Sequence, residues 1–320
     1  GDEDALTTLG RRPGAALASD GVSTSRRALV VTSGRDRGSL AGIRALARAG
    51  WTVGVGTPDG TGMVTASRAV AHRHVVPRPR GSCSPFVTAV QIAVEEAGYD
   101  VVLGGGDDWM AALAAHATLL PAVVAAPPAP VVATALDKLG LARRAVAAGM
   151  ATPRTELATP AAVRSWTGPV VVKARAHWRP GRRPGPRIET RRYSTPDAAA
   201  ARLAALVGAG CEAVLQEPVD GGLEALIGVF DGGRLHGLVH QRSSGLWPTP
   251  SGVTSRARTV RPDRALVAGA ERLLADLRWD GLVELQFLRD RAGAAHLIDL
   301  NGRFYGSMAL ALAAGGNLAD

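Results

Sequence analysis

Short apolar segments alternate with segments of helical periodicity from residue 27 to residue 130, and this order restricts the fold more than any other feature. We expect strands at Ala28–Thr32, Trp51–Val55 and Asp100–Leu103, and helices at Ser39–Ala49 and Pro85–Ala97. Strands that alternate with helices favour a doubly wound parallel sheet. The sequence therefore predicts an α/β domain over residues 27–130.

The rest of the chain departs from this alternation and indicates an α+β arrangement in two lobes. Residues 131–210 contain a helix that begins at Lys138 and a strand that ends at Lys173. Residues 211–320 are mostly antiparallel strands around one long helix. We expect residues 131–210 to form a small lobe and residues 211–320 a large lobe.

The two ends of the chain carry separate expectations. Residues 1–26 are polar and contain no apolar run of signal-peptide length, so we expect a disordered leader. The chain stops at Asp320 within an Ala-rich helical region, so we expect the large lobe to be truncated.

Composition excludes several classes of function. The net charge of +9 suits anionic small molecules, whereas the aromatic content of 4% and the scattered Arg argue against nucleic acid. Cys83 and Cys211 lie far apart without metal-ligand spacing, which fits a reduced, cytoplasmic protein. Residues 117–136 carry no charge, but four prolines interrupt them, so we expect no membrane span.

Lysine is almost absent from this basic chain. Of 37 basic residues only Lys138 and Lys173 are lysines. An ammonium is a compact point charge that holds phosphate where a wide guanidinium does not fit. Lys173 closes an apolar strand and Lys138 follows Asp137 at a helix start, so we interpret both as phosphate ligands rather than as surface residues retained by chance.

Two strands near the end of the chain, Leu282–Leu288 and Ala295–Asn301, alternate apolar and oxygen-bearing side chains. Alternate residues of a strand share a face. The core face is expected to hold Val283, Leu285, Phe287, Ile298 and Leu300, and the opposite face Glu284, Gln286, Asp299 and Asn301. A cluster of side-chain oxygens suits Mg²⁺, although a solvated strand face is the commoner explanation for a single strand.

Two glutamates form a weaker signal upstream. Glu217 ends an apolar strand in Gln216-Glu217-Pro218, and Glu224 follows seven residues later. Carboxylates at a strand end can bond an adenine amino group or ribose hydroxyls, although most such residues are solvated.

The order of these residues resembles the ATP-grasp superfamily, and most closely its carbamoyl-phosphate-synthase-like and biotin-carboxylase-like branch. The resemblance covers about residues 28–318 and is carried by Asp137-Lys138, Val171-Val172-Lys173, Gln216-Glu217-Pro218-Val219, Glu224, Leu285-Gln286-Phe287 and Ile298-Asp299-Leu300-Asn301-Gly302-Arg303-Phe304. It implies a Rossmann-like pre-ATP-grasp domain followed by a two-lobed ATP-grasp domain with antiparallel sheets.

The resemblance also implies a role for each matching residue. Lys138 and Lys173 hold the triphosphate; Gln216, Glu217, Pro218 and Val219 meet adenine; Glu224 binds ribose. Gln286, Asp299 and Asn301 ligate Mg²⁺, with Mn²⁺ as the alternative ion and Glu284 as a further ligand, and Arg303 contacts the transferred phosphoryl group. Lys173 and Arg303 are thus the expected catalytic residues. A cationic loop, residues 175–187, stands where the family has a glycine-rich flap, and it either binds substrate or is solvated.

The activity implied is that of an ATP- and Mg²⁺-dependent, ADP-forming ligase that joins a small carboxylate to an amine through an acylphosphate. We expect no nucleic-acid or membrane partner and a homodimer as one possible assembly. Two alternatives stay open: a catalytically weak or idle protein that keeps the nucleotide-binding or an RNA-binding function, and a nicotinamide-dependent oxidoreductase. The second lacks support, because Gly54-Val55-Gly56-Thr57 supplies no acid at the end of the second strand.

Overall fold

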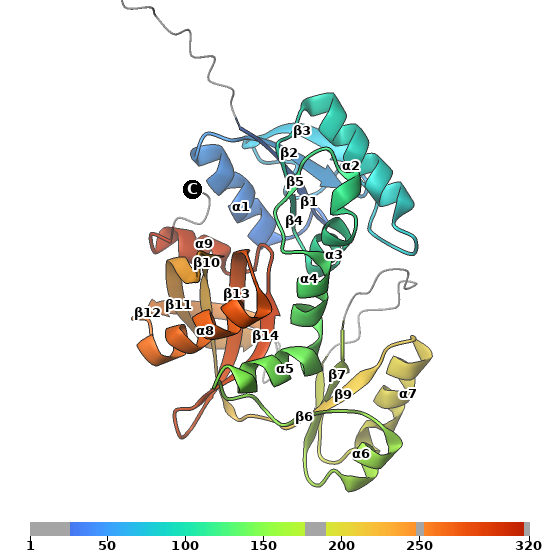
Figure 1. Ribbon diagram of the computed structural model, residues 1–320, viewed down its shortest axis with the longest axis vertical. Coiled ribbons are helices and arrows are strands. Elements are labelled where there is room, and N and C mark those ends of the chain that lie inside the picture. Colours follow the sequence, from blue (N-terminus) through green and yellow to red (C-terminus); the bar gives the residue numbers. More distant parts are fainter. Residues whose placement is uncertain (1–25, 177–189, 248–252, 317–320) are drawn as a thin grey trace, which may run out of the picture.

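The computed structural model describes residues 26–176, 190–247 and 253–316, and the strands of this part form three sheets (Figure 1). The predicted leader, except for Arg26, lies outside the described residues, as do residues 177–187 of the cationic loop. Among the described helices, none combines the length and the apolar character that a membrane crossing requires.

Five of the described strands form a parallel sheet, sheet A, in the order β3-β2-β1-β4-β5. They are β1 (Arg27–Val31), β2 (Thr52–Thr57), β3 (Val70–Val75), β4 (Val101–Gly104) and β5 (Val123–Val124). Helix α1 (Arg37–Arg48) packs on one face, and α2 (Ser84–Ala97) and α3 (Asp107–Ala115) pack on the other. The predicted doubly wound parallel sheet is therefore confirmed.

Four further described strands form sheet C, an antiparallel sheet in the order β6-β9-β7-β8. They are β6 (Thr155–Leu157), β7 (Val170–Ala174), β8 (Arg191–Tyr193) and β9 (Ala213–Gln216). Helices α6 (Pro160–Ser165) and α7 (Ala200–Gly208) cover the outer face, where Val170, Val172, Leu206 and Leu215 are buried. β9 pairs with β6 and β7 in this sheet, although its residues fall in the range expected for the large lobe.

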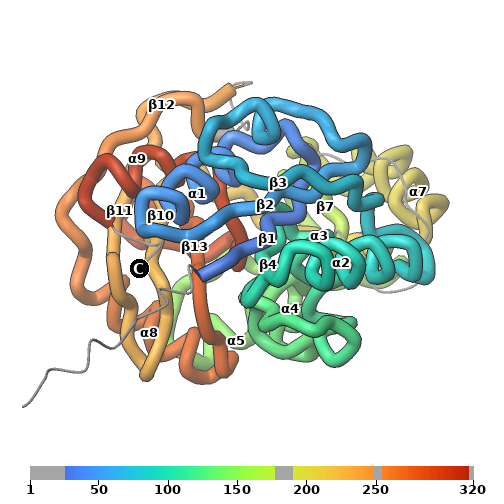
Figure 2. The backbone as a smooth tube through the Cα atoms, turned by 90° about the horizontal axis from the view of Figure 1, so that it is seen from above, coloured from blue at the N-terminus to red at the C-terminus, as the bar shows by residue number. Residues whose placement is uncertain are grey.

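The last five described strands form sheet B, antiparallel in the order β12-β11-β10-β13-β14. They are β10 (Gly221–Asp231), β11 (Arg234–Trp247), β12 (Val253–Val260), β13 (Gly281–Asp290) and β14 (Ala295–Asn301). One face buries Leu226, Leu285 and Phe287 against α4 (Ala129–Leu136), α5 (Lys138–Ala147) and α8 (Arg264–Leu277). Sheet B and helix α7 lie on opposite sides of the molecule in both Figure 1 and Figure 2.

The second face of sheet B joins the N-terminal domain. Ile227 and α9 (Met308–Ala313) share a buried cluster with Val30 of β1 and Ile43 of α1. Helix α1 approaches the β14–α9 loop so closely that a Cβ at Gly38 would lie 2.3 Å from the Tyr305 carbonyl oxygen. This packing fixes the loop that follows Asn301 against the N-terminal domain.

The β13–β14 pairing confirms one prediction and corrects another. Glu284 pairs with Asn301 and Gln286 pairs with Asp299, so the four oxygen-bearing side chains share a face as expected. The register then shifts, and Phe287 pairs with Leu297. Leu297 therefore takes the buried position expected for Ile298, which is only partly buried, because the bulge inserts one residue into β14.

Candidate active site

The ammonium of Lys138 lies at the start of α5 and faces the edge strand β14. Asp137 caps this helix: one of its carboxylate oxygens accepts from the backbone N–H groups of Leu139 at 3.0 Å and Gly140 at 3.2 Å. The Lys138 side chain is 5% exposed and forms an ion pair with Asp299. The two residues expected to bind phosphate and metal therefore lie in direct contact.

Lys173 lies on the inner face of sheet C, opposite to the face that α6 and α7 cover. Burial and the positive charge of Lys138 together lower its pKa to about 8, although the Asp299 carboxylate opposes both effects. Such charge interactions require short distances. Helix α5, strand β7 and strand β14 therefore bring Lys138, Lys173 and Asp299 into one electrostatic cluster.

Glu284 is the centre of the oxygen-bearing face of sheet B. Its Oε2 atom accepts hydrogen bonds from Asn301 Nδ2 at 2.7 Å and from Gln286 Nε2 at 3.1 Å. Burial raises the pKa of Glu284 to about 7, which the positive charge of Arg303 and the Asn301 hydrogen bond partly offset. All four predicted metal ligands therefore interact. Asn301 and Gln286 donate hydrogen bonds to Glu284, and the charge of Asp299 acts on the Glu284 carboxylate.

Arg303 links this cluster to the N-terminal domain. Its Nε donates to Asp107 Oδ1 at 3.0 Å, and its Nη2 donates to Asn301 Oδ1 at 3.1 Å. Although burial opposes it, the Asp107 carboxylate raises the pKa of Arg303, so the guanidinium stays charged. Asp107, the first residue of α3, was missed by the sequence analysis; the signal that marks it is an acidic residue directly after the Gly104-Gly105-Gly106 turn.

The donor set of this cluster fits a hard cation that is completed by phosphate oxygens. Asp299 and Glu284 supply carboxylates, and Gln286 and Asn301 supply amide oxygens. The described residues contain no group of three or more His, Cys, Asp and Glu side chains able to hold a metal alone. Mg²⁺ typically takes one or two carboxylates from the protein and its other ligands from water and substrate phosphates, so the residues present fit it.

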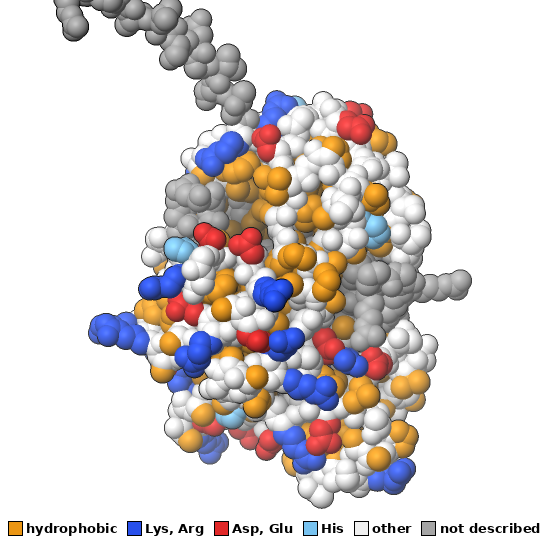
Figure 3. Space-filling model, in the orientation of Figure 1, with side chains coloured by type: hydrophobic (Ala, Val, Ile, Leu, Met, Phe, Trp, Pro, Cys, Tyr) orange, Lys and Arg blue, Asp and Glu red, His pale blue; other side chains and the backbone are white. Residues whose placement is uncertain are grey.

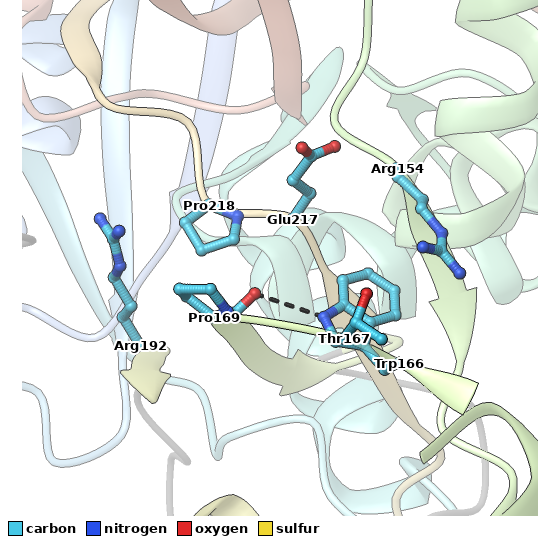
Figure 4. A pocket seen from close by; sticks show the side chains of 7 residues that line it. All are labelled: Arg154, Trp166, Thr167, Pro169, Arg192, Glu217 and Pro218. Carbon is cyan, nitrogen blue, oxygen red and sulfur yellow. Dashed lines mark hydrogen bonds between the residues drawn. The ribbon is translucent and has the colours of Figure 1, made fainter. Parts of the chain in front are cut away.

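The segment Gln216–Val219 connects sheet C to sheet B and borders a cavity. This cavity of about 310 Å³ is lined by Glu217, Pro218, Trp166, Thr167, Pro169, Arg154 and Arg192 (Figure 4). Arg154 stacks over the Trp166 ring at 4.5 Å, and the Trp166 N–H donates to the Pro169 carbonyl at 3.3 Å. Gln216 points elsewhere, since its amide donates to Thr155 Oγ1 at 2.9 Å.

Glu224 borders the same small cavity as Glu284 and Gln286, but its side chain makes its contacts on the other face of sheet B. In β10 it pairs with Phe287, whereas its neighbour Ala225 pairs with Gln286, so Glu224 faces the opposite side of sheet B. There its side chain, 1% exposed, accepts hydrogen bonds from Arg289 Nε at 2.9 Å and Arg242 Nε at 3.1 Å. This geometry does not favour the ribose contact expected of Glu224 and indicates a role in stability.

Replacing Glu224 with Gln is expected to cost about 2 kcal/mol of unfolding free energy at neutral pH, the usual scale for hydrogen bonds to a charged group. Burial opposes the shift, but the His240 imidazole at 3.4 Å and the hydrogen bonds from Arg289 lower the Glu224 pKa from 4.5 to about 2. The stabilisation is therefore complete above pH 4.5 and is lost as the pH falls towards 2. Urea unfolding from pH 7 to pH 2 should show the difference between wild type and variant shrinking over this interval.

The control for this experiment is Glu95→Gln, which changes an exposed carboxylate on α2. That variant should stay within about 0.5 kcal/mol of wild type at each pH, as is usual for surface substitutions. A Glu224→Gln deficit that is constant from pH 7 to pH 2 would exclude an ionised, stabilising Glu224.

A second, smaller cavity of about 20 Å³ lies beside Glu284 and Gln286, on their face of sheet B. Ser307, Ser243 and Gln241 also line it. The Gln241 side chain is buried, and its amide nitrogen has no hydrogen-bond partner among the described residues. A space of this size holds about one water-sized group, so a polar group of a ligand fits here.

On the face shown in Figure 3, basic side chains are interspersed with acidic ones and form no single stripe.

Comparison with solved structures identifies this architecture. The L-amino acid ligase from Bacillus licheniformis superposes with a TM-score of 0.67 at 14% identity, over 89% of this chain and 68% of that one. A biotin carboxylase from Campylobacter jejuni gives 0.64 at 15% identity, over 88% of this chain and 67% of that one. The N5-carboxyaminoimidazole synthetase from Staphylococcus aureus, complexed with ADP, superposes with a TM-score of 0.63 at 11% identity, over 88% of this chain and 71% of that one.

The chain therefore has the ATP-grasp fold, and the predicted resemblance to its biotin-carboxylase-like branch is confirmed at the level of fold. Residues 241–320 also match the model of a family described as ATP-grasp in the biosynthetic pathway with Ter operon. No curated protein matches the sequence.

Proposed function

We propose that this chain is an ATP- and Mg²⁺-dependent ligase that joins a small carboxylate to an amine and releases ADP and phosphate. The observation that carries the proposal is the meeting of Lys138, Lys173 and Asp299, which come from three separate elements. Two buried ammonium groups repel each other, and a polyanion that lies between them removes this penalty. A triphosphate is such a polyanion.

In this proposal each cluster serves one part of the nucleotide. Lys138 and Lys173 bind the phosphates, and the segment Gln216–Val219 lies beside the base. Asp299, Asn301, Gln286 and Glu284 hold Mg²⁺, which neutralises charge on the phosphates when it is bound. Arg303, fixed by Asp107, directs its remaining N–H groups towards the phosphoryl group that is transferred.

The reaction needs positioning and charge neutralisation more than covalent help from the protein. An oxygen of the substrate carboxylate attacks the γ-phosphorus, the bond to the β,γ-bridging oxygen breaks, and ADP leaves. The amine nitrogen then attacks the acyl carbon of the acylphosphate, phosphate leaves, and the nitrogen loses a proton. Lys173 and Arg303 offset the charge that develops in the first step.

The small cavity beside Glu284 places the amide of Gln241 next to the proposed metal ligands. Gln241 can donate its unused N–H groups to a substrate oxygen there. A buried amide without a partner is costly, and a ligand that pairs with it recovers that cost. The chemical identity of the carboxylate and the amine is the first question for experiment.

Release of ADP from Mg²⁺ and ATP, screened over amino acids and small carboxylic acids with products identified by mass, tests this function. The proposal expects ADP release that depends on both a carboxylate and an amine, with a product heavier by their condensation. Tight ATP binding without ADP release under any pair would favour the idle nucleotide-binding protein, which the single metal-site aspartate Asp299 and the neutral Gln286 allow. Absence of ATP binding would contradict both functions.

A further inference from the structure

The guanidinium of Arg175 joins two carboxylates at the base of the loop after β7. Its Nε lies 2.9 Å from both Asp137 oxygens, its Nη2 lies 2.6 Å from Asp137 Oδ2, and its Nη1 lies 3.3 Å from both Glu212 oxygens. A planar guanidinium that grips a carboxylate with two nitrogens fixes orientation as well as distance. We call these three residues the Asp137–Arg175–Glu212 clamp.

The backbone reinforces the clamp at the same point. The Lys138 N–H donates to the Arg175 carbonyl at 2.9 Å, and the Arg175 N–H donates to the Glu212 carbonyl at 2.8 Å. Asp137 meanwhile caps α5 through the N–H groups of Leu139 and Gly140. The clamp therefore ties the first turn of α5 to the end of strand β7 and the start of strand β9.

Two of the clamp residues are close neighbours of the lysines in the sequence. Asp137 directly precedes Lys138, and Arg175 follows Lys173 by two residues. Whatever holds Asp137 to Arg175 thus also holds the backbone of one ammonium at a fixed distance from the other. The charge of Arg175 is balanced by two carboxylates, so this first residue of the cationic loop is not available to bind an anionic substrate.

We infer that the Asp137–Arg175–Glu212 clamp positions Lys138 and Lys173 at the separation at which both bind one triphosphate. The inference rests on the proposed function, since it assigns these lysines to ATP. Physically, two buried ammonium groups push their elements apart, and Asp299 neutralises only part of this repulsion. The clamp resists that force through residues that do not themselves touch the nucleotide.

The test is equilibrium binding of ATP and of AMP, each with Mg²⁺, to Asp137→Asn, Arg175→Gln and Glu212→Gln variants. Asn caps a helix about as well as Asp, so Asp137→Asn removes the ion pair and keeps α5. We expect ATP to bind about 10 to 100 times more weakly to the first two variants and about 3 times more weakly to the third, whose carboxylate is more exposed. AMP, which lacks the β- and γ-phosphates, should change less than 3-fold.

The matched control is Arg144→Gln. Arg144 lies in the last turn of α5 and forms an exposed ion pair with Asp276 of α8 at 3.1 Å, so its loss disturbs the same helix away from the lysines. We expect its ATP affinity to stay within 2-fold of wild type.

The outcomes separate the two proposals. Failure of the wild-type protein to bind ATP would overturn the proposed function. If wild type binds ATP, and Asp137→Asn and Arg175→Gln bind it as tightly as the control Arg144→Gln does, the clamp alone is overturned. Equal weakening of ATP and AMP would also overturn it, because a purely structural role predicts no selectivity for the β- and γ-phosphates.

Discussion

A Lys173→Met variant is expected to turn over ATP 10² to 10³ times more slowly than wild type and to bind ATP at least 10 times more weakly. Methionine is close to lysine in length and fills the same buried position at the end of β7, so the change removes the charge and little else. Loss of a single preorganised charge donor at a reacting centre typically has an effect of this size. Steady-state rates of ADP release and equilibrium ATP binding measure the two quantities.

The pH dependence of ATP binding gives an independent check on the same residue. Burial and the charge of Lys138 lower the Lys173 pKa from 10.5 to about 8, so the free protein loses this charge as the pH rises through 8. Bound phosphate favours the ammonium, and binding above pH 8 should therefore take up a proton. Calorimetry in buffers of different ionisation enthalpy should detect this uptake in wild type and not in Lys173→Met.

The same pKa shift makes stability rise with pH, as the shift of Glu224 does, because both pKa values are lower in the folded protein than in the unfolded chain. Between pH 8 and 10.5 the unfolded chain keeps the Lys173 proton and the folded protein does not, so this group favours folding more as the pH rises. Below pH 8 the buried charge of Lys173 destabilises the folded protein.

Unchanged ATP affinity and turnover in Lys173→Met would contradict the assignment of Lys173 to the active site.

Asp299→Asn is expected to raise the Mg²⁺ concentration needed for half-maximal ADP release by about 10 to 100 times. The change leaves one carboxylate, Glu284, in the cluster and removes the partner of Lys138 in the free protein. Without the Asp299 charge the Lys173 pKa should fall further, because Asp299 is the group that raises it. A Mg²⁺ titration of activity at saturating ATP measures the effect.

The control for the metal site is Asp276→Asn, which removes an exposed carboxylate on α8 that pairs with Arg144. Its Mg²⁺ requirement should match that of wild type. An Asp299→Asn enzyme with an unchanged Mg²⁺ requirement would show that the cation, if it binds, does so elsewhere.

The parts of the fold that were predictable are those with strong periodicity. The α/β order of residues 27–130 and the alternation in β13 were sufficient to predict a parallel sheet and the shared face of Glu284 and Gln286. The bulge near Ile298 was not predictable, because the side-chain pattern of a single strand does not show where its partner skips a residue. The assignment of β9 to sheet C also depends on long-range pairing that local pattern does not encode.

The candidate site divides in the same way. Lys138, Lys173 and Asp299 were predictable because their residue types and order are informative, and the structure brings them together. Asp107 and Arg175 were missed because each acts across a large separation in sequence, one on Arg303 and the other on Asp137. Nothing in the local sequence distinguishes such a residue from a solvated one.

Glu224 illustrates the reverse case. Its spacing from Glu217 suggested a nucleotide contact, but the pleat of β10 directs its side chain to the face that carries Arg289. Spacing along the chain does not determine the face of a strand until the register with its neighbour is known. The residue is better explained as a buried, ion-paired carboxylate that stabilises sheet B.

The most direct test of the central claim is a crystal structure of this protein grown with ADP and Mg²⁺. The account predicts phosphate oxygens within hydrogen-bond distance of both Lys138 and Lys173, and a metal ion on Asp299 and Asn301. A nucleotide bound away from either lysine, or an ordered metal ion that Asp299 does not contact, would contradict it.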